Sequence, residues 1–313
     1  MVELTDPYAG TTGRWLKGAL HVHTTRSDGK EPADDVVRHY RRLGFDFVVL
    51  TDHNAVPAAE ELGRKGSILV IPGTEFRGPG GPEFGITGVR SMPRAADDVP
   101  SYHAQALASG GFVTFNHPTW HIHHWPVWWM LKLPGVHALE VYNAVIEWLP
   151  GAAECADKWD RLLTCGCRLW GVATDDAHEG SQRGKGWVMV DAAREEGAIV
   201  AALKTGRFYA SSGVRINRVA VRRGEMVVES ANAQEIRFYA DRGAMRESKR
   251  GRRAAYRIRE DDVFVRAELY GSGASKAWTN PVFVETERSR ALSDEFRTWY
   301  LRQQRELARI QPG

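Results

Sequence analysis

Residues 18–53, GALHVHTTRSDGKEPADDVVRHYRRLGFDFVVLTDH, contain two short apolar runs separated by a polar segment. Within the polar segment, apolar side chains recur at the three- and four-residue spacing of an amphipathic helix: Val36, Val37, Tyr40 and Leu43. Gly44 follows as a helix stop, and the second apolar run is dense in β-branched residues. The stretch therefore predicts a strand, a helix and a second strand, with histidines at the end of each strand.

The same alternation of apolar runs and helix-like segments continues to residue 212, through the runs SILVIPGTE, FVTFNH, VHALEVYN and RLWGVATDDAH. Strands that alternate with helices form a parallel sheet covered by helices. With about seven such strands, an α/β barrel is favoured over an open sheet. Periodicity alone leaves the open sheet as an alternative.

Beyond residue 212 the pattern changes to short alternating segments such as RINRVAVRRG and VFVRAELYG, separated by glycines or charged turns. Alternation with a period of two is typical of antiparallel strands with one face in water. We therefore expect a small β-sandwich-like domain over residues 213–287. The apolar spacing in SDEFRTWYLRQQRELARI predicts a C-terminal helix within residues 288–313.

Metal-binding side chains follow the ends of the predicted strands: His21, His23, His53, Glu75, His117, Asp176 and His178. Asp28 lies in a Ser-Asp-Gly turn, from which its carboxylate can swing back over the first strand end. The carboxyl ends of barrel strands converge on one rim, and a mixed set of imidazoles and carboxylates suits Zn, Mn or Fe. Eight ligands exceed what one ion needs and suit two or three ions, with Glu75 as the candidate bridge.

The motifs HxH with TTRSDG, LTDHN, IPGTE, FNHP and TDDAH follow one another over roughly residues 17–180. In this order they resemble the PHP (polymerase and histidinol phosphatase) superfamily of metal-dependent hydrolases. Further on, LKTGRFYASSG and VRAELYGSGASKAWTNPVF resemble a two-domain, carbaryl-hydrolase-like branch. The resemblance implies a distorted seven-stranded (β/α)7 barrel over residues 1–212 with a di- or trinuclear site at its C-terminal face. The small antiparallel β domain and the terminal helix would follow it.

The resemblance also implies how the ligands are shared between ions. One ion would be held by His21, His23, Glu75 and Asp176, and a second by Asp28, His53 and His178. A third would share Glu75 with His117 and needs one more ligand, for which Glu140 and Asn143 in ALEVYN are weak substitutes. Trinuclear relatives have a His or Cys in that region, and many relatives carry a His where this chain reads GPEFGITG. We therefore expect two divalent ions, Mn, Fe or Zn, with a third as the alternative.

The predicted site favours a hydrolase in which a hydroxide bridging the ions attacks the substrate, with Asp176 and His178 as the ligands nearest the chemistry. Because characterised family members mostly cleave phosphate esters, a small phosphate ester is the expected substrate. The first alternative is a carboxylic or carbamic ester or amide hydrolase with the same metals, to which this branch is also linked. The second alternative is a non-catalytic metal-binding module, which would be expected to have lost ligands.

Further residues near the motifs are weaker candidates for substrate contact. Arg26, Arg183 and Lys185 flank the metal motifs and can meet a phosphate through charge-assisted hydrogen bonds, although a solvated charge is the slightly favoured interpretation for each. The segment TWHIHHWPVWW, residues 119–129, is expected to form an aromatic loop walling the pocket. Contact of His121 or His123 with substrate is the alternative for that segment.

Composition limits the classes of partner. The chain has 313 residues and a net charge of only +3, which gives little reason to expect nucleic acid. No window approaches the roughly 20 apolar residues of a membrane span, and three cysteines without a disulfide framework favour a cytoplasmic protein. The expected partner is a small-molecule substrate. Oligomers could form through the β domain or the C-terminal helix.

Overall fold

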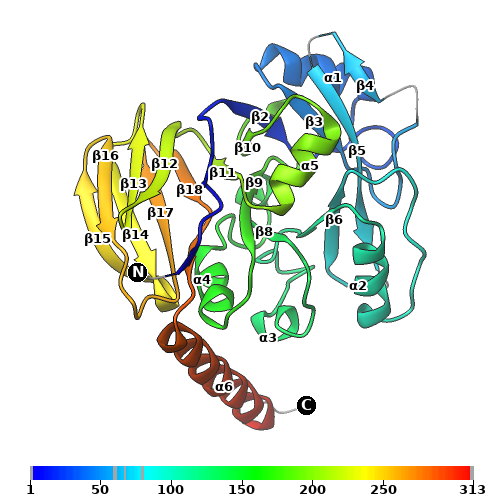
Figure 1. Ribbon diagram of the computed structural model, residues 1–313. Coiled ribbons are helices and arrows are strands. Elements are labelled where there is room, and N and C mark those ends of the chain that lie inside the picture. Colours follow the sequence, from blue (N-terminus) through cyan, green and yellow to red (C-terminus); the bar gives the residue numbers. More distant parts are fainter. Residues whose placement is uncertain (1–2, 59–61, 67, 79–80, 311–313) are drawn as a thin grey trace.

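The structure is a computed structural model that describes residues 3–58, 62–66, 68–78 and 81–310, and its fold is mixed α/β (Figure 1). Its α-helices are α1 (Ala33–Arg42), α2 (Val99–Ala108), α3 (Val127–Met130), α4 (Ala156–Thr164), α5 (Glu196–Lys204) and α6 (Glu287–Ile310). The strands up to residue 212 are β1 (Leu4–Thr5), β2 (Trp15–Ala19), β3 (Phe47–Leu50), β4 (Gly63–Lys65), β5 (Ile68–Arg77), β6 (Glu83–Thr87), β7 (Phe112–Phe115), β8 (Ala138–Asn143), β9 (Trp170–Thr174), β10 (Trp187–Asp191) and β11 (Phe208–Ser211). The later strands are β12 (Ile216–Arg222), β13 (Glu225–Ser230), β14 (Glu235–Ala240), β15 (Ala244–Arg250), β16 (Arg253–Arg257), β17 (Phe264–Tyr270), β18 (Lys276–Thr279) and β19 (Val282–Val284).

The central sheet is curled and passes through β2, β3, β5, β6, β7, β8 and β9 in that order. The first three of these strands pair in parallel, and so do the last three. Strand β6 runs antiparallel to both β5 and β7, and the described residues between β5 and β6 are not helical. The α/β architecture agrees with the prediction, but the exact (β/α)7 repeat is not confirmed, because a β5–β6 hairpin stands where one strand–helix unit was expected.

The sheet curls until the ends of its first and last strands meet. Just beyond β2 and β9, Val22 and Ala177 form a parallel bridge. The amide of His23 donates to the carbonyl of Ala177 at 3.0 Å, and the amide of Asp176 donates to the carbonyl of His21 at 3.1 Å. Because these bonds join segments more than 150 residues apart, they bring the first and last predicted metal motifs into direct contact.

Helix α1 shows why the opening stretch folds as a strand–helix–strand unit. Its residues Val36, Val37 and Tyr40 are buried in one cluster with β3 and β5, as the helical spacing predicted. Acidic residues in its first turn and basic residues in its last turn complement the helix dipole. Leu43, expected on the same apolar face, is instead the C-terminal cap and is 38% exposed.

The C-terminal strands are antiparallel, as their alternating pattern indicated. Strands β12, β13 and β16 form a small separate sheet, whereas β14, β17, β18 and β19 pair with one another or with earlier strands. Strand β11 pairs with β18, so the main sheet continues from the barrel strands into the C-terminal strands (Figure 1).

Helix α6 follows these strands and packs against α4, with Tyr300 buried in the main hydrophobic cluster (Figure 1). Residues 311–313 of the expected C-terminal helix lie outside the described part of the chain. Across the described residues, no helix combines the length and the apolar character needed to cross a membrane.

Candidate metal centre

Four fully buried residues bring their ligand atoms together where the ends of β2 and β9 meet. They are His21, His23, Glu75 and Asp176, and their ligand atoms lie within 4.8 Å of one another. The Nε2 atom of His21 is 3.2 Å from both Glu75 Oε2 and Asp176 Oδ1. The Nε2 atom of His23 is 3.1 Å from Asp176 Oδ1 and 3.4 Å from Glu75 Oε2. The structure thus unites the residues expected around the first ion.

A second set lies beside the first and opens to solvent: His23, Asp28, His53 and His178. Asp28 is at its centre, with its carboxylate oxygens 3.2 Å from His53 Nε2 and 3.4 Å from His178 Nε2. The Asp28 side chain is 52% exposed, so this set forms the accessible side of the cluster. These include the three residues expected around the second ion, with His23 shared between the two sets.

A glycine allows the Asp28 turn to fold over the strand end. The amide of Gly29 donates to the carbonyl of Thr24 at 3.0 Å, which closes the turn. A Cβ atom at Gly29 would lie 2.6 Å from the backbone carbon of His23, closer than real side chains approach. Gly29 is therefore required for the turn that brings Asp28 to the histidines.

Several ligand atoms are buried without a hydrogen-bond partner among the described residues, namely His21 Nε2, His53 Nδ1 and Glu83 Oε2. His53 Nδ1 nevertheless lies 3.1 Å from Glu75 Oε2. Ligand atoms about 2.1 Å from one ion in tetrahedral geometry are about 3.4 Å apart and point at the ion, not at each other. Buried polar atoms that converge without bonding fit a cation between them.

Electrostatics in the cluster also favour cations. Burial opposes protonation of His117, yet the adjacent Glu75 and Glu83 carboxylates outweigh it and raise its pKa to about 10. Burial likewise opposes protonation of His21, and the surrounding carboxylates raise its pKa well above the usual value. In return, His21 and its neighbours hold the pKa of Glu75 and Asp176 low despite burial. With these histidines neutral, as metal ligands are, the carboxylates of the cluster would be left for a cation to balance.

Glu83 was missed by the sequence analysis, and it is fully buried at the edge of the cluster. The Nε2 atom of His117 lies 2.9 Å from Glu75 Oε1 and 3.1 Å from Glu83 Oε2. His53 Nδ1 is 3.6 Å from Glu83 Oε1. Glu83 begins β6, and because β6 is antiparallel to β5, its amino end meets the carboxyl end of β5 at the rim. Glu83 was not predicted because the expected ligands were those at the carboxyl ends of strands, and Glu83 lies at an amino end.

Glu140 and Asn143 lie next to the ligands and hold them. Both oxygens of Glu140 accept hydrogen bonds, from the Thr174 hydroxyl at 2.8 Å and from the His117 amide at 2.5 Å, and Oε1 is 2.7 Å from His21 Nδ1. Asn143 Nδ2 donates to Glu140 at 2.8 Å and to Asp176 Oδ2 at 3.1 Å. An Nδ1–H donated to Glu140 leaves the Nε2 lone pair of His21 facing the cluster, which is the tautomer that a metal requires.

Strained backbone marks the same rim. Asn54, His117 and Asp176 have φ angles of 47°, 29° and 53°, in the left-handed region that non-glycine residues rarely adopt. Two of the three carry predicted ligand side chains, and the third follows the ligand His53. Such strain persists where surrounding contacts enforce it, and it is common at functional sites.

The residues expected to contact substrate are placed differently from one another. Arg183 is buried and its Nη1 donates to Glu31 at 2.6 Å, whereas Lys185 and His121 are exposed. Arg26 donates to the carbonyl of Val56 at 2.9 Å. His123 is half-buried, with Nδ1 3.2 Å from the carbonyl of Gly81.

The aromatic loop approaches the cluster through Trp120. Its ring packs edge-on against His117 with centroids 5.1 Å apart, and it lies 4.8 Å from the ring of His123. Of the aromatic wall expected from this segment, Trp120 is the residue that contacts a histidine of the cluster.

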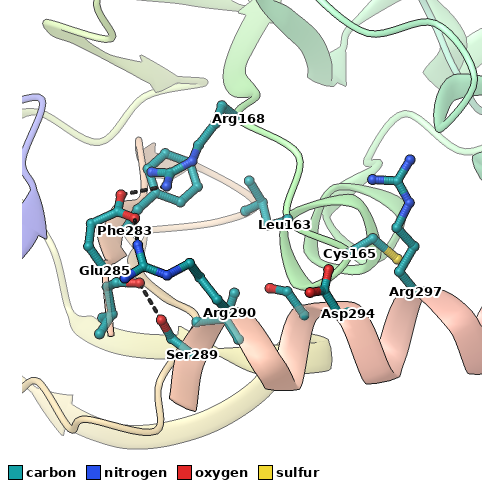
Figure 2. A pocket seen from close by; sticks show the side chains of 13 residues that line it. Leu163, Cys165, Arg168, Phe283, Glu285, Ser289, Arg290, Asp294 and Arg297 are labelled. Carbon is teal, nitrogen blue, oxygen red and sulfur yellow. Dashed lines mark hydrogen bonds and ion pairs between the residues drawn. The ribbon is translucent and has the colours of Figure 1, made fainter. Parts of the chain in front are cut away.

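A separate pocket between the end of α4, β19 and the start of α6 lies away from these residues (Figure 2). Its Glu285 pairs with Arg168 and lies 3.8 Å from Arg290. Among the described residues that line it, none belongs to the predicted site. The Glu285 carboxylate in this pocket is thus balanced by two arginines.

Fold and site together define a mixed α/β protein with a His/Asp/Glu cluster that could hold metal ions at the rim of a curled sheet. No family model and no curated protein matches the chain. In structure the chain is similar to a two-domain protein from Bacteroides vulgatus containing a predicted PHP-like metal-dependent phosphoesterase, with 19% identity and a TM-score of 0.48 over 89% of this chain and 98% of that one. A Bifidobacterium adolescentis protein with a predicted assignment as a metal-dependent phosphoesterase has 14% identity and a TM-score of 0.40 over 52% of this chain and 88% of that one.

These neighbours carry the description that the sequence motifs suggested, and neither concerns the carbaryl-hydrolase-like branch. Both TM-scores are below 0.5, so the assignment of a function to this chain depends on its own residues.

Proposed function

We propose that the chain is a metal-dependent phosphoesterase that hydrolyses a small phosphate ester with two divalent ions, Mn, Fe or Zn. The proposal rests on one observation: buried imidazoles and carboxylates converge at 3.1–3.4 Å with orphaned ligand atoms between them. His21, His23, Glu75 and Asp176 would hold the first ion. Asp28, His53 and His178 would hold the second, with His23 within reach of both.

Bound ions at such a site polarise a phosphoryl oxygen and lower the pKa of a coordinated water. The residues of the chain contribute orientation. His178 Nδ1 lies 2.9 Å from the carbonyl of Asp176, so its Nε2 atom faces Asp28. Because Asp28 and His178 line the exposed side, we propose that the substrate approaches from there.

Glu83 supports the alternative of a third ion. A third ion would be held by Glu75, His117 and Glu83, and Glu83 Oε2 is buried without a hydrogen-bond partner among the described residues, 3.1 Å from His117 Nε2. Glu83 then supplies the ligand that the resemblance left open, while Glu140 orients His21. Metal analysis of the purified protein tests this: Glu83→Gln should bind one ion fewer than the parent if three are bound, and the same number if two are bound.

The reaction is tested with one chromophore on two esters. The manganese-loaded protein should release p-nitrophenol from its phosphate, and His178→Ala should lose this activity, because it removes one of the ligands proposed for the second ion. His124→Ala, which removes an exposed histidine outside the cluster, serves as the matched control and should keep it. Equal activity in His178→Ala and the parent would contradict the metal assignment.

A carboxylic or carbamic ester hydrolase is the second candidate, because Trp120 stands against His117 and an indole wall suits an aryl group. In that case p-nitrophenyl acetate would be cleaved and the phosphate would not. The two esters share their leaving group, so the comparison isolates the bond that the site attacks.

A further inference from the structure

The β5–β6 hairpin joins a buried ligand to a solvent-exposed cation. Arg77 and Glu83 lie directly opposite each other in the strand register. Arg77 Nε pairs with Glu83 Oε1, while Glu83 Oε2 faces His117 inside the cluster. Glu83 is completely buried, whereas the Arg77 side chain is 41% exposed. The pair therefore connects the buried metal centre with solvent.

The guanidinium of Arg77 has unused donors. An arginine has five N–H groups in a planar fork, and only the Nε–H of Arg77 is used by Glu83. Neither Nη group has a hydrogen-bond partner within the described part of the chain. The backbone amide of Arg77 donates to Asn54 Oδ1 at 2.9 Å, which fixes the end of β5 beside His53. The guanidinium of Arg77 is thus held through Nε, and its two Nη groups are available to a ligand.

Other cations near the centre are less available for an anion. Arg183 is buried against Glu31, and Lys30 pairs with Glu179. Arg26 donates to a backbone carbonyl. Arg77 combines exposure, an anchored guanidinium and direct contact with a cluster carboxylate.

We propose that Arg77 binds the anionic group of the substrate and so makes the site selective for phosphate esters over neutral esters. This inference rests on the proposed phosphoesterase function. Ions bound at the cluster offset the carboxylates, so the charge of Arg77 is then available to a phosphate. Its two Nη groups can meet two phosphate oxygens in the bidentate geometry that arginine favours.

The test compares manganese-loaded Arg77→Met and Arg77→Lys with the parent. Arg90→Met is the matched control, because Arg90 also pairs with a glutamate, Glu196, and is exposed, but lies away from the cluster. For Arg77→Met, kcat/KM for p-nitrophenyl phosphate should fall about 10- to 100-fold, the value of a charged hydrogen bond or two. The kcat/KM of Arg77→Lys should lie between those of the parent and Arg77→Met, because an ammonium keeps the positive charge but lacks the two Nη groups. Calorimetry with inorganic phosphate should show affinity falling in the same order, while bound manganese stays unchanged.

The outcomes separate this inference from the function on which it rests. If the parent cleaves the phosphate ester and Arg77→Met does so equally well, the function stands and the role of Arg77 is overturned. If the parent cleaves no phosphate ester, the proposed function fails, and the role of Arg77 is then decided by the calorimetry with inorganic phosphate. An affinity for phosphate that is unchanged in Arg77→Met overturns that role. A loss of bound manganese in Arg77→Met equal to the loss of activity would also overturn it, since Arg77 would then act only through Glu83.

Discussion

Two of the buried charge clusters in the described part of the chain are organised in opposite ways. In the first, between α4 and β17, Arg266 Nε and Nη2 donate to the two oxygens of Asp160, each at 2.6 Å, and Nη1 donates to Glu268 at 2.8 Å. The hydroxyl of Tyr270 donates to the remaining Glu268 oxygen at 2.7 Å. Every carboxylate oxygen in this network has a donor.

The metal centre, in contrast, gathers five carboxylates around its histidines, Asp28, Glu75, Glu83, Glu140 and Asp176, with the guanidinium of Arg77 at the edge. It leaves His21 Nε2, His53 Nδ1 and Glu83 Oε2 buried without hydrogen bonds among the described residues. Because burying an unpaired polar atom costs free energy, a cluster that retains several is completed by something else. We call the Arg266 network the balanced cluster, because each of its carboxylate oxygens has a hydrogen-bond donor, whereas several buried ligand atoms of the metal centre have no hydrogen-bond partner among the described residues.

The largest expected effect comes from removing one anionic ligand of the centre. Asp176→Asn should lower kcat/KM for the phosphate ester about 10⁴-fold, because a neutral amide replaces the carboxylate 3.1 Å from His23 and 3.2 Å from His21. Manganese at 100 times its Kd should stabilise the parent by about 2.7 kcal/mol and the variant by much less, measured as a shift in Tm.

Asp160→Asn is the matched control for that variant, since it neutralises a buried aspartate of the balanced cluster. It should keep the manganese-induced rise in Tm. If both variants lose that response to the same extent, the distinction between the two clusters is wrong.

The next largest effect concerns stability. Arg266→Met leaves Asp160 and Glu268 buried without their cation, which should lower the free energy of unfolding by about 3–5 kcal/mol. Urea unfolding measures the loss, and kcat/KM at a temperature where the variant is folded should stay within about threefold of the parent. The triple variant Asp160→Asn, Arg266→Met, Glu268→Gln should recover part of the stability, because no unpaired charge remains. A loss below about 1 kcal/mol in Arg266→Met would contradict this account of the network.

The sequence was most informative where one rule governs both fold and site. Because parallel strands present their carboxyl ends at one rim, His21 and Asp176 could be placed together although they are far apart in the chain. Glu83 escaped because β6 is antiparallel and contributes its amino end to that rim. Only the direction of β6, which depends on its neighbours in the sheet, reveals it.

The balanced cluster was beyond sequence reasoning for a different reason. In VRAEL, Arg266 and Glu268 alternate with apolar residues and indicate a face in water, yet β17 is buried on both faces because α4 covers the polar one. Asp160 belongs to α4, more than 100 residues earlier. Such pairing depends on how two distant elements pack, which local periodicity does not record.

A smaller effect should follow from loosening a ligand without removing it. Glu140→Gln keeps the size of the side chain but replaces one acceptor by a donor, so it cannot accept from both the His117 amide and His21 Nδ1–H, and His21 loses the support for its metal-binding tautomer. Residues that orient metal ligands typically contribute 10- to 100-fold to metal affinity. Manganese titration should show a loss in that range. Unchanged affinity would mean that Glu140 does not orient His21.

The smallest effect is expected at the amino end of β8, opposite the metal centre. Burial, with Lys204 nearby, lowers the pKa of His137 to about 4, and its Nδ1 accepts the amide of Val113 at 3.1 Å. The unfolded chain binds this proton near pH 6.5, so stability is complete above that pH and is lost as pH falls towards 4. His137→Asn keeps the acceptor but cannot be protonated. In chelator, its Tm should therefore fall less than that of the parent between pH 7.5 and pH 5, and parallel Tm profiles would show that His137 is not the titrating group.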